Sequence, residues 1–289
     1  MRLPIRVSAA LALVVLCSTA AFAQDPPAPT PPPAASAVPD DAVIKLEEPD
    51  FTLIALPTSL RLPEFKSAFR VTHRFTRPLS CDTCPNSLAG DGFGIDTGAQ
   101  IGLEYRFGVF KNTQISIDRT SDKTVELSGQ YGVMRQNAHS PLEASILVAV
   151  DASNVGRSGS PSQYSPIVGL ILTRLVGDRA ALYVEPMWLH HTNLFQPLIS
   201  DNDTVMVGLG ARVRISAGVY LDGEFSPRVS GYKPGANQGS FAIEKRLGGH
   251  MFQLNFSNAF GTQLSQLAQG APSGTTNWYM GFNITRKFY

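Results

Sequence analysis

The chain has little charge, little cysteine and no long apolar run after its first residues. Charged residues make up 16% of its 289 residues, and the formal net charge is only +1. This balance argues neither for nor against nucleic-acid binding, but no basic stretch interleaved with aromatics is present, so no nucleic-acid partner is expected. No segment beyond the start offers the run of about 20 apolar residues that a transmembrane helix needs. If the chain sits in a membrane, it therefore does so as a β-barrel.

The first residues predict export. Arg2 and Arg6 form a basic region, residues 9–16 an apolar region, and residues 21–23 (Ala-Phe-Ala) an A-x-A cleavage site. This order is typical of a secretory signal peptide, here residues 1–23. We therefore expect the chain to be exported through a bacterial inner membrane.

Three further regions follow the predicted signal peptide. Residues 24–41 are rich in proline and are predicted to be a disordered linker, because such a composition cannot form a packed core. Residues 42–65 are more apolar and are interrupted by prolines, so they could lie under a barrel or enter it as a plug. Residues 66–289 carry the strand pattern of the predicted barrel.

The last segment of the chain has a period of two residues, which is the strand period. With Arg286 as the exception, every second residue is apolar: Trp278, Met280, Phe282, Ile284 and Phe288. The segment resembles the C-terminal strand of bacterial outer-membrane β-barrels, which ends in an aromatic residue and is read by the barrel assembly machinery. The resemblance implies an outer-membrane location, with outer-membrane lipid and the assembly machinery as partners.

The same alternation recurs from residue 66 onward and predicts roughly twelve strands, within the even numbers of single-chain bacterial barrels. The links between the strands alternate between short and long, except for a tight link at residues 120–123. Short turns on one side and long loops on the other are typical of a membrane barrel. The predicted fold class is all-β: an antiparallel up-and-down transmembrane β-barrel. Residues 164–175 are apolar on both faces and fit this pattern least well.

Aromatic residues gather at strand ends, as the two interfacial belts of a membrane barrel require. The predicted outer belt contains Phe75, Tyr164, Trp188, Phe225, Phe241, Phe260 and Trp278. The predicted inner belt contains Phe69, Phe107, Phe110, Phe252 and Phe288. Scattered core aromatics of a soluble protein would not sort by strand end.

Charges of both signs lie on the parity that a barrel turns toward its lumen. The predicted lumen charges are Arg70, Arg74, Glu104, Arg106, Glu126, Glu185, Arg212, Arg214, Asp222, Glu224, Glu244 and Arg246. An unpaired charge inside a narrow barrel is costly, so most of these charges are expected to pair across strands. Such pairing predicts a narrow pore or a closed pillar. The alternative interpretation is a selective channel whose charged constriction chooses its solute.

Cys81 and Cys84 form a C-x-x-C sequence in the first outer loop. C-x-x-C can be a redox motif or half of a zinc site, but neither a βαβ context nor a second C-x-x-C is present. In an oxidising compartment, a disulfide that stabilises the loop is expected. Residues 91–96 faintly suggest calcium ligation, yet Gly-Asp turns are ordinary in outer loops. We therefore predict neither a metal nor a cofactor.

His190, Thr192 and Asn193 follow the predicted seventh strand. They resemble the His-x-Ser-Asn motif of outer-membrane phospholipases and lipid A deacylases, barrels whose catalytic His and Ser lie two residues apart on the lipid-facing side. His190 and Thr192 have that spacing and the lipid-facing parity, although threonine stands where the motif has serine. The resemblance implies an alternative function, an outer-membrane lipid hydrolase that would use these three residues.

A longer resemblance covers residues 60–289. It depends on residues 55–60 (Ala-Leu-Pro-Thr-Ser-Leu), 73–75 (His-Arg-Phe) and 183–186 (Tyr-Val-Glu-Pro). On these residues the chain is similar to an uncharacterised family of bacterial outer-membrane β-barrels, a domain of unknown function. The resemblance implies the fold and the location and brings no activity with it. The leading hypothesis is a non-enzymatic barrel, either a narrow porin-like channel for small solutes or a structural or attachment barrel for a periplasmic partner.

Overall fold

The part of the chain that the structure describes is almost entirely β-structure. The structure is a computed structural model and describes residues 46–81, 84–156, 163–192, 203–272 and 277–289. The predicted signal peptide, the predicted linker and residues 42–45 lie outside these ranges. The strands are β1 (Ser67–Pro78), β2 (Ala99–Phe110), β3 (Thr113–Thr120), β4 (Val125–Met134), β5 (Glu143–Ser153), β6 (Gln163–Val176), β7 (Ala180–Leu189), β8 (Thr204–Ser216), β9 (Val219–Ser226), β10 (Arg228–Ser230), β11 (Gln238–Leu247), β12 (His250–Ser257) and β13 (Tyr279–Phe288). The helical pieces are η2 (Gly92–Thr97) and α1 (Leu264–Gln269).

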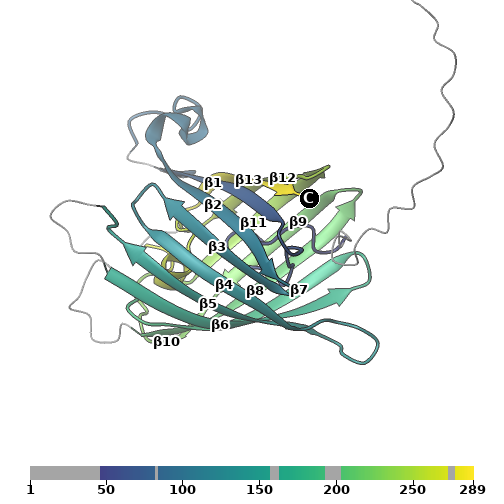
Figure 1. Ribbon diagram of the computed structural model, residues 1–289. Helices are drawn as coiled ribbons and strands as arrows, with labels where there is room; N and C mark the ends of the chain where they lie inside the picture. Colours follow the sequence, from purple (N-terminus) through teal and green to yellow (C-terminus); the bar gives the residue numbers. More distant parts are fainter. Residues whose placement is uncertain (1–45, 82–83, 157–162, 193–202, 273–276) are drawn as a thin grey trace, which may run out of the picture. The chain divides into compact units, whose positions relative to one another are not determined.

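The strands form one antiparallel sheet that closes on itself (Figure 1). β1 pairs with β13, and the sheet closes through the pairing of β8 with β9. β10 continues β9 beyond Pro227 and also pairs with β8, so the wall is a 12-strand barrel. Closure removes every free sheet edge, which a bilayer requires because hydrocarbon offers no hydrogen bonds. The predicted all-β barrel is confirmed.

The two ends of the barrel differ in the length of their links. The end that we call the short-turn end carries the links 111–112, 135–142, 177–179, 217–218 and 248–249. Gly177, Gly218 and Gly248 take positive φ angles of 57°, 69° and 58° in the tightest of these turns. Glycine is the residue that adopts this backbone conformation without steric cost. The opposite end, the long-loop end, carries the remaining links, of which only the β3–β4 turn is tight, as the sequence predicted.

The outward face of the wall is apolar. On β2, Leu103 and Tyr105 are exposed, whereas Gly102 and Arg106 on the other face are buried. The same alternation on the other strands builds the outward apolar band that lipid tails require. Among the described residues, no helix is long and apolar enough to cross a membrane.

Phe75 does not belong to the predicted outer aromatic belt, and that part of the prediction is wrong. Its exposure is only 7%. The pairing of β1 with β13 shifts register between Arg74 and Pro78, and Gly94 of η2 lies directly against the Phe75 side chain. The outer loop therefore covers a position that strict alternation would have turned toward lipid.

β6 is apolar on both faces because the barrel has an apolar interior on that side. Ile167 and Ile171 point into the lumen and are 1% and 0% exposed. They belong to a buried cluster that also contains Leu56 and Leu267, which are not part of the wall. Residues 164–175, which fitted the alternation of a barrel strand least well, thus lie where other segments pack against the wall inside the lumen.

Two segments of the chain fill the lumen. Residues 48–62, which we call the plug segment, precede β1 and enter from the short-turn end. Residues 259–271, which we call the inner loop, connect β12 to β13 and fold in from the long-loop end with α1. Both segments contribute leucines to one apolar cluster with the wall strands β5–β8. The described part of residues 42–65 therefore lies inside the barrel, apart from the exposed residues near its two ends.

Candidate functional site

The plug segment is held mainly through its main chain. Wall side chains donate hydrogen bonds to its carbonyl oxygens: Arg70 to Ile54 (2.6 Å), Arg212 to Thr52 (2.9 Å), Gln253 to Leu53 (2.9 Å), Asn283 to Ile54 (3.2 Å), Gln114 to Leu60 (3.1 Å), Gln130 to Thr58 (2.9 Å) and Lys287 to Pro49. Every peptide unit carries such a carbonyl. These contacts consequently do not depend on which side chains the plug segment has.

Glu224 on β9 binds three successive amides of the plug segment. The N–H groups of Ile54, Ala55 and Leu56 donate to its Oε2 atom at 3.2, 2.9 and 3.0 Å. Hydrogen bonds to an ionised acceptor are roughly twice as strong as neutral ones, and successive amides that converge on one anion form a nest. Glu224 thus fixes residues 54–56 of the plug segment against β9.

Two glycines of β8 make room for the leucines of the plug segment. An ideal Cβ atom at Gly208 would lie 2.8 Å from a methyl group of Leu56, and one at Gly210 would lie 2.3 Å from a methyl group of Leu53. Real side chains do not approach this closely, so any larger residue would displace the plug segment. Glycine inside a strand often marks such a close approach of another segment.

Arg212 connects three wall strands to the plug segment. Its side chain is fully buried, and it pairs with Asp222 of β9 (2.9 Å) and Glu244 of β11 (3.1 Å). The same guanidinium donates to the carbonyl oxygen of Thr52. The guanidinium therefore donates hydrogen bonds to two carboxylates and a carbonyl oxygen. A charge buried in a low-dielectric interior needs such partners.

The inner loop is held in the same way from the other end. Arg74 of β1 donates to the carbonyl oxygen of Ala259 (2.9 Å). At the start of α1, the N–H of Leu264 donates to Glu126 (2.9 Å) and the N–H of Ser265 to Asp151 (2.8 Å). The wall again binds main-chain groups with its charged side chains.

The alternation of short and long links predicts an ordinary long loop between β12 and β13, so the sequence does not predict the inner loop. One signal could have found it: Leu264, Leu267 and Ala268 have helical spacing and are apolar. In the structure they are 4%, 1% and 0% exposed. A short apolar helix in a loop of a barrel is explained by burial within the lumen.

Between the plug segment and the inner loop lies a small polar cavity of about 40 Å³. Arg70, Glu104, Arg106, Asp118 and Glu126 line it together with residues of both lumen segments. A space of this size accommodates water rather than a solute. At this place, the described residues of the two lumen segments leave room for water only.

The predicted lumen charges lie on the lumen side of the wall, but the prediction that most of them pair across strands is wrong. Arg70, Glu126 and Glu224 bind the main chain of the lumen segments. Arg106 pairs with Glu104 of its own strand (2.5 Å). The physical reason is that segments inside the lumen bring buried carbonyl and N–H groups, which must also be satisfied.

Arg214 and Arg246 lie near the short-turn end and are only partly buried. Arg214 donates to Asp178 of the β6–β7 turn, and the two side chains are 19% and 60% exposed. Arg214 is thus a rim residue rather than a member of the interior cluster around Arg212. The side-chain parity was predicted correctly, but parity does not report depth.

The proposed hydrolase motif does not have the predicted geometry. His190 is partly exposed and its Nδ1 atom lies 2.5 Å from Asp203, but Thr192 is 0% exposed. His191 adopts a left-handed φ of 53°, which breaks the strand alternation between His190 and Thr192. The prediction that His190 and Thr192 share the lipid-facing side is therefore wrong. Asn193 lies outside the described residues.

A disulfide and an ion pair stabilise the first outer loop, which connects β1 to β2. Cys81 and Cys84 are joined by a disulfide with their Cα atoms 5.5 Å apart. Asp91 pairs with the buried Arg77 at 2.6 Å and accepts from Asn86 at 2.7 Å. Asp91, the first residue of the segment with a faint calcium pattern, is thus engaged by a cation and an amide. In the described part of the chain, no group of three or more candidate ligands could hold a metal ion.

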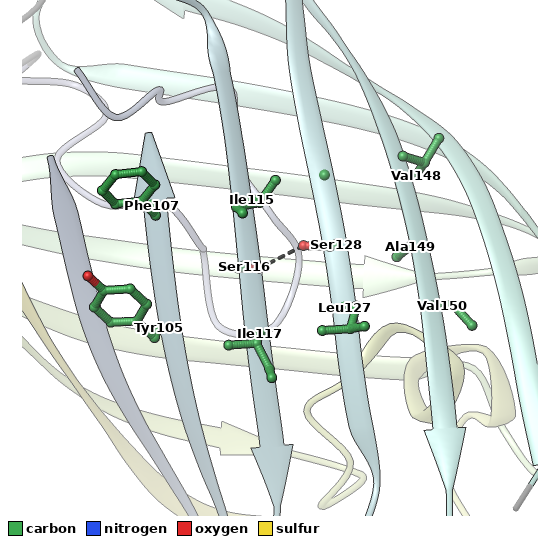
Figure 2. Close-up of a pocket in the computed structure, with 11 residues that line it drawn as sticks. Tyr105, Phe107, Ile115, Ser116, Ile117, Leu127, Ser128, Val148, Ala149 and Val150 are labelled. Carbon is green, nitrogen blue, oxygen red and sulfur yellow. Dashed lines mark hydrogen bonds between the residues drawn. The ribbon is translucent and has the colours of Figure 1, made fainter. Parts of the chain in front are cut away.

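A groove of about 810 Å³ runs along the outward face of β2–β5 (Figure 2). Tyr105, Ile115, Ile117 and Leu127 line it, and Gly129 leaves it open because it has no side chain. All four side chains are about half exposed. The groove belongs to the apolar band that faces lipid, and it offers almost no polar group for recognition. We therefore place the candidate site in the lumen.

Comparison with known families supports this architecture. The sequence profile of the membrane bound beta barrel domain family (DUF5777) matches residues 51–288. The chain belongs to this family. The match begins inside the plug segment, so the DUF5777 domain includes most of that segment as well as the wall. No curated protein matches the chain significantly in sequence.

Solved structures similar to the DUF5777 barrel include both channels and an enzyme. The NanC porin has a TM-score of 0.50 and 7% identity, covering 76% of this chain and 100% of that chain. An outer-membrane channel from Pseudomonas putida F1 has a TM-score of 0.49 and 10% identity, covering 78% of this chain and 97% of that chain. Outer membrane phospholipase A from Escherichia coli has a TM-score of 0.44 and 12% identity, covering 84% of this chain and 95% of that chain. At such identities the likeness to the NanC porin shows the fold alone. The protein is thus a membrane-bound β-barrel with the fold of outer-membrane barrels, and its activity must be argued from its own site.

Proposed function

We propose that this protein is a non-enzymatic outer-membrane barrel that acts as a narrow channel for small solutes and that its own plug segment keeps the channel closed. The observation that carries the proposal is the content of the lumen. The plug segment and the inner loop fill it, and wall groups such as Glu224 and Arg212 bind the plug segment through its main chain.

A purely structural pillar would be built differently. In a pillar, wall side chains would fill the lumen by packing on one another, as in small closed barrels. Here the wall directs charged and amide side chains at a segment that is not part of the wall and that leads into it at β1. Short turns are periplasmic in bacterial outer-membrane barrels, so we expect the short-turn end, and with it the predicted linker of residues 24–41, to lie on the periplasmic side. A periplasmic partner that binds them would act on the plug segment.

Single-channel conductance in a planar bilayer tests this function. The wild type is expected to stay almost closed, with conductance far below that of a general porin. Leu53→Asp should produce frequent openings, because it buries an unpaired carboxylate in the apolar slot over Gly210 and so weakens the plug segment.

The matched control is Leu46→Asp. Leu46 is 38% exposed at the start of the described chain, so this substitution should leave the barrel closed. A wild type that passes ions as freely as a general porin would show that the plug segment does not close the channel.

The lipid hydrolase remains the competing function, and a direct assay separates the two. We expect the purified wild type in detergent, with or without calcium, to release no fatty acid from phospholipid or lipid A. The reason is that the Thr192 side chain is fully enclosed while His190 is partly exposed. Measurable release that is lost in His190→Ala would support the hydrolase and count against the channel.

A further inference from the structure

The wall around the plug segment is arranged to recognise a peptide main chain. Its arginine, lysine, glutamine and asparagine side chains donate to carbonyl oxygens between Pro49 and Leu60, and Glu224 accepts from three successive amides. The plug segment forms a turn here, since Thr52 pairs with Pro57 and the N–H of Leu53 donates to the carbonyl oxygen of Leu56. Any peptide that forms the same turn offers the same main-chain groups. The wall also contacts side chains of the plug segment: the slots over Gly208 and Gly210 take leucines, and Tyr183 and Thr285 donate to Glu48 and Asp50.

One buried wall group is not used by the plug segment. Glu185 on β7 is 0% exposed, and neither of its carboxylate oxygens has a hydrogen-bond partner among the described residues. A buried carboxylate without a partner is costly. Its position therefore points to a cationic ligand that is not present in the closed state.

Glu185 borders the slot that Leu56 fills. An ideal Cβ atom at Gly208 would lie 2.8 Å from a Leu56 methyl group and 3.2 Å from the Cβ atom of Glu185. Leucine offers the carboxylate no donor. A lysine side chain is longer and carries three donors and a positive charge at its end, so from the same slot it can reach the carboxylate.

We propose that the lumen wall is a binding site for an oligopeptide that forms the same turn as the plug segment and carries a basic side chain at the place of Leu56. The plug segment occupies this site until such a peptide replaces it. This inference rests on the proposed function, since a ligand can enter only where the plug segment can leave. It names the solute class of the channel as peptides.

The test uses the full chain with its plug segment loosened by Leu53→Asp, which leaves every wall residue intact. Fluorescent synthetic peptides of residues 46–64 are titrated in the native form, with Leu56→Lys and with Leu56→Met, an uncharged unbranched control. The lysine peptide should bind about tenfold or more tightly than the methionine peptide, as a hydrogen bond to a charged group allows. The difference should vanish when the barrel also carries Glu185→Gln.

A fourth peptide tests recognition of the main chain. Replacing the N–H of Ala55 by an ester oxygen removes one donor to Glu224 without changing a side chain. We expect affinity to fall by about tenfold or more. Equal binding of the lysine and methionine peptides, or undiminished binding of the ester peptide, would overturn the inference. If the wild type itself conducts like an open porin, the failure belongs to the proposed function instead.

A second measurement covers the case in which the loosened chain does not fold. In the otherwise unchanged full chain, Leu56→Lys should melt about 2–4 °C or more above Leu56→Met, because the lysine gains the carboxylate of Glu185 as its partner. In the Glu185→Gln background this advantage should disappear. A melting temperature of Leu56→Lys at or below that of Leu56→Met would contradict the inference.

Discussion

Replacing Arg212 by alanine is expected to lower the free energy of unfolding by about 3–5 kcal/mol, because it removes the cation of a buried ion cluster. Asp222 and Glu244 would remain buried without that partner, and the carbonyl oxygen of Thr52 would lose a donor. Urea unfolding in detergent, followed by the fluorescence of the 2 tryptophans, measures the loss. The uncompensated carboxylates should also draw in water, so cation conductance should rise.

Arg214→Ala is the matched control, two residues further along the same strand. Its partner Asp178 is 60% exposed, and exposed pairs contribute about 0–1 kcal/mol. We expect little change in stability and no change in conductance. Equal losses for the two variants would mean that the cluster around Arg212 is not what holds the plug segment.

Deleting Phe288 and Tyr289 is expected to keep most of the chain from assembling into the outer membrane. Phe288 lies opposite Ser67 in the β1–β13 pairing that closes the barrel. Without this contact the barrel has a partly open edge, which hydrocarbon does not tolerate. The strand also resembles the segment that the assembly machinery reads in other barrels. Outer-membrane fractionation and the shift between heated and unheated samples on gels measure the assembled fraction.

The control for this deletion is Phe110→Ala. Phe110 is 64% exposed at the same end of the barrel, but it ends β2 rather than the closing strand. Loss of one interfacial aromatic should leave assembly nearly normal. Normal insertion of the truncated chain would count against the closing strand as an assembly signal.

The wall of the barrel could be predicted from the sequence because two environments impose one simple rule. Residues that face lipid must be apolar, and neighbours in a strand point to opposite faces. Leu103 and Arg106 follow this rule, and the links follow the related rule of short turns and long loops. The strand number and the closure order followed from these regularities.

The contents of the lumen obey no such local rule. The prolines of residues 42–65 and the leucines of α1 are compatible with several positions, and only contacts with distant strands choose among them. Ile54 meets Glu224, and Leu264 meets Glu126, across more than half or nearly half of the chain. Such contacts produce no periodic pattern in the sequence. For this reason the sequence alone does not decide whether residues 42–65 lie under the barrel or inside it.

Single backbone angles could not be predicted from the sequence either. The hydrolase hypothesis assumed that alternation continues through His190, His191 and Thr192. The left-handed φ of His191 ends the alternation one residue before the position that mattered. The prediction that Phe75 belongs to the outer aromatic belt was wrong for a related reason. A register shift in β1 and the nearby Gly94 of the loop changed its surroundings.

The plug segment also implies an order of folding. It is synthesised before any wall strand, yet its contacts join residues 170 positions apart at Ile54 and Glu224 and 238 apart at Pro49 and Lys287. Contacts that close such long loops form slowly, after more local pairings. The hairpins of the wall therefore assemble first, and an empty barrel precedes the filled one. The plug segment is made before the wall and becomes ordered after it, with the finished wall as its template.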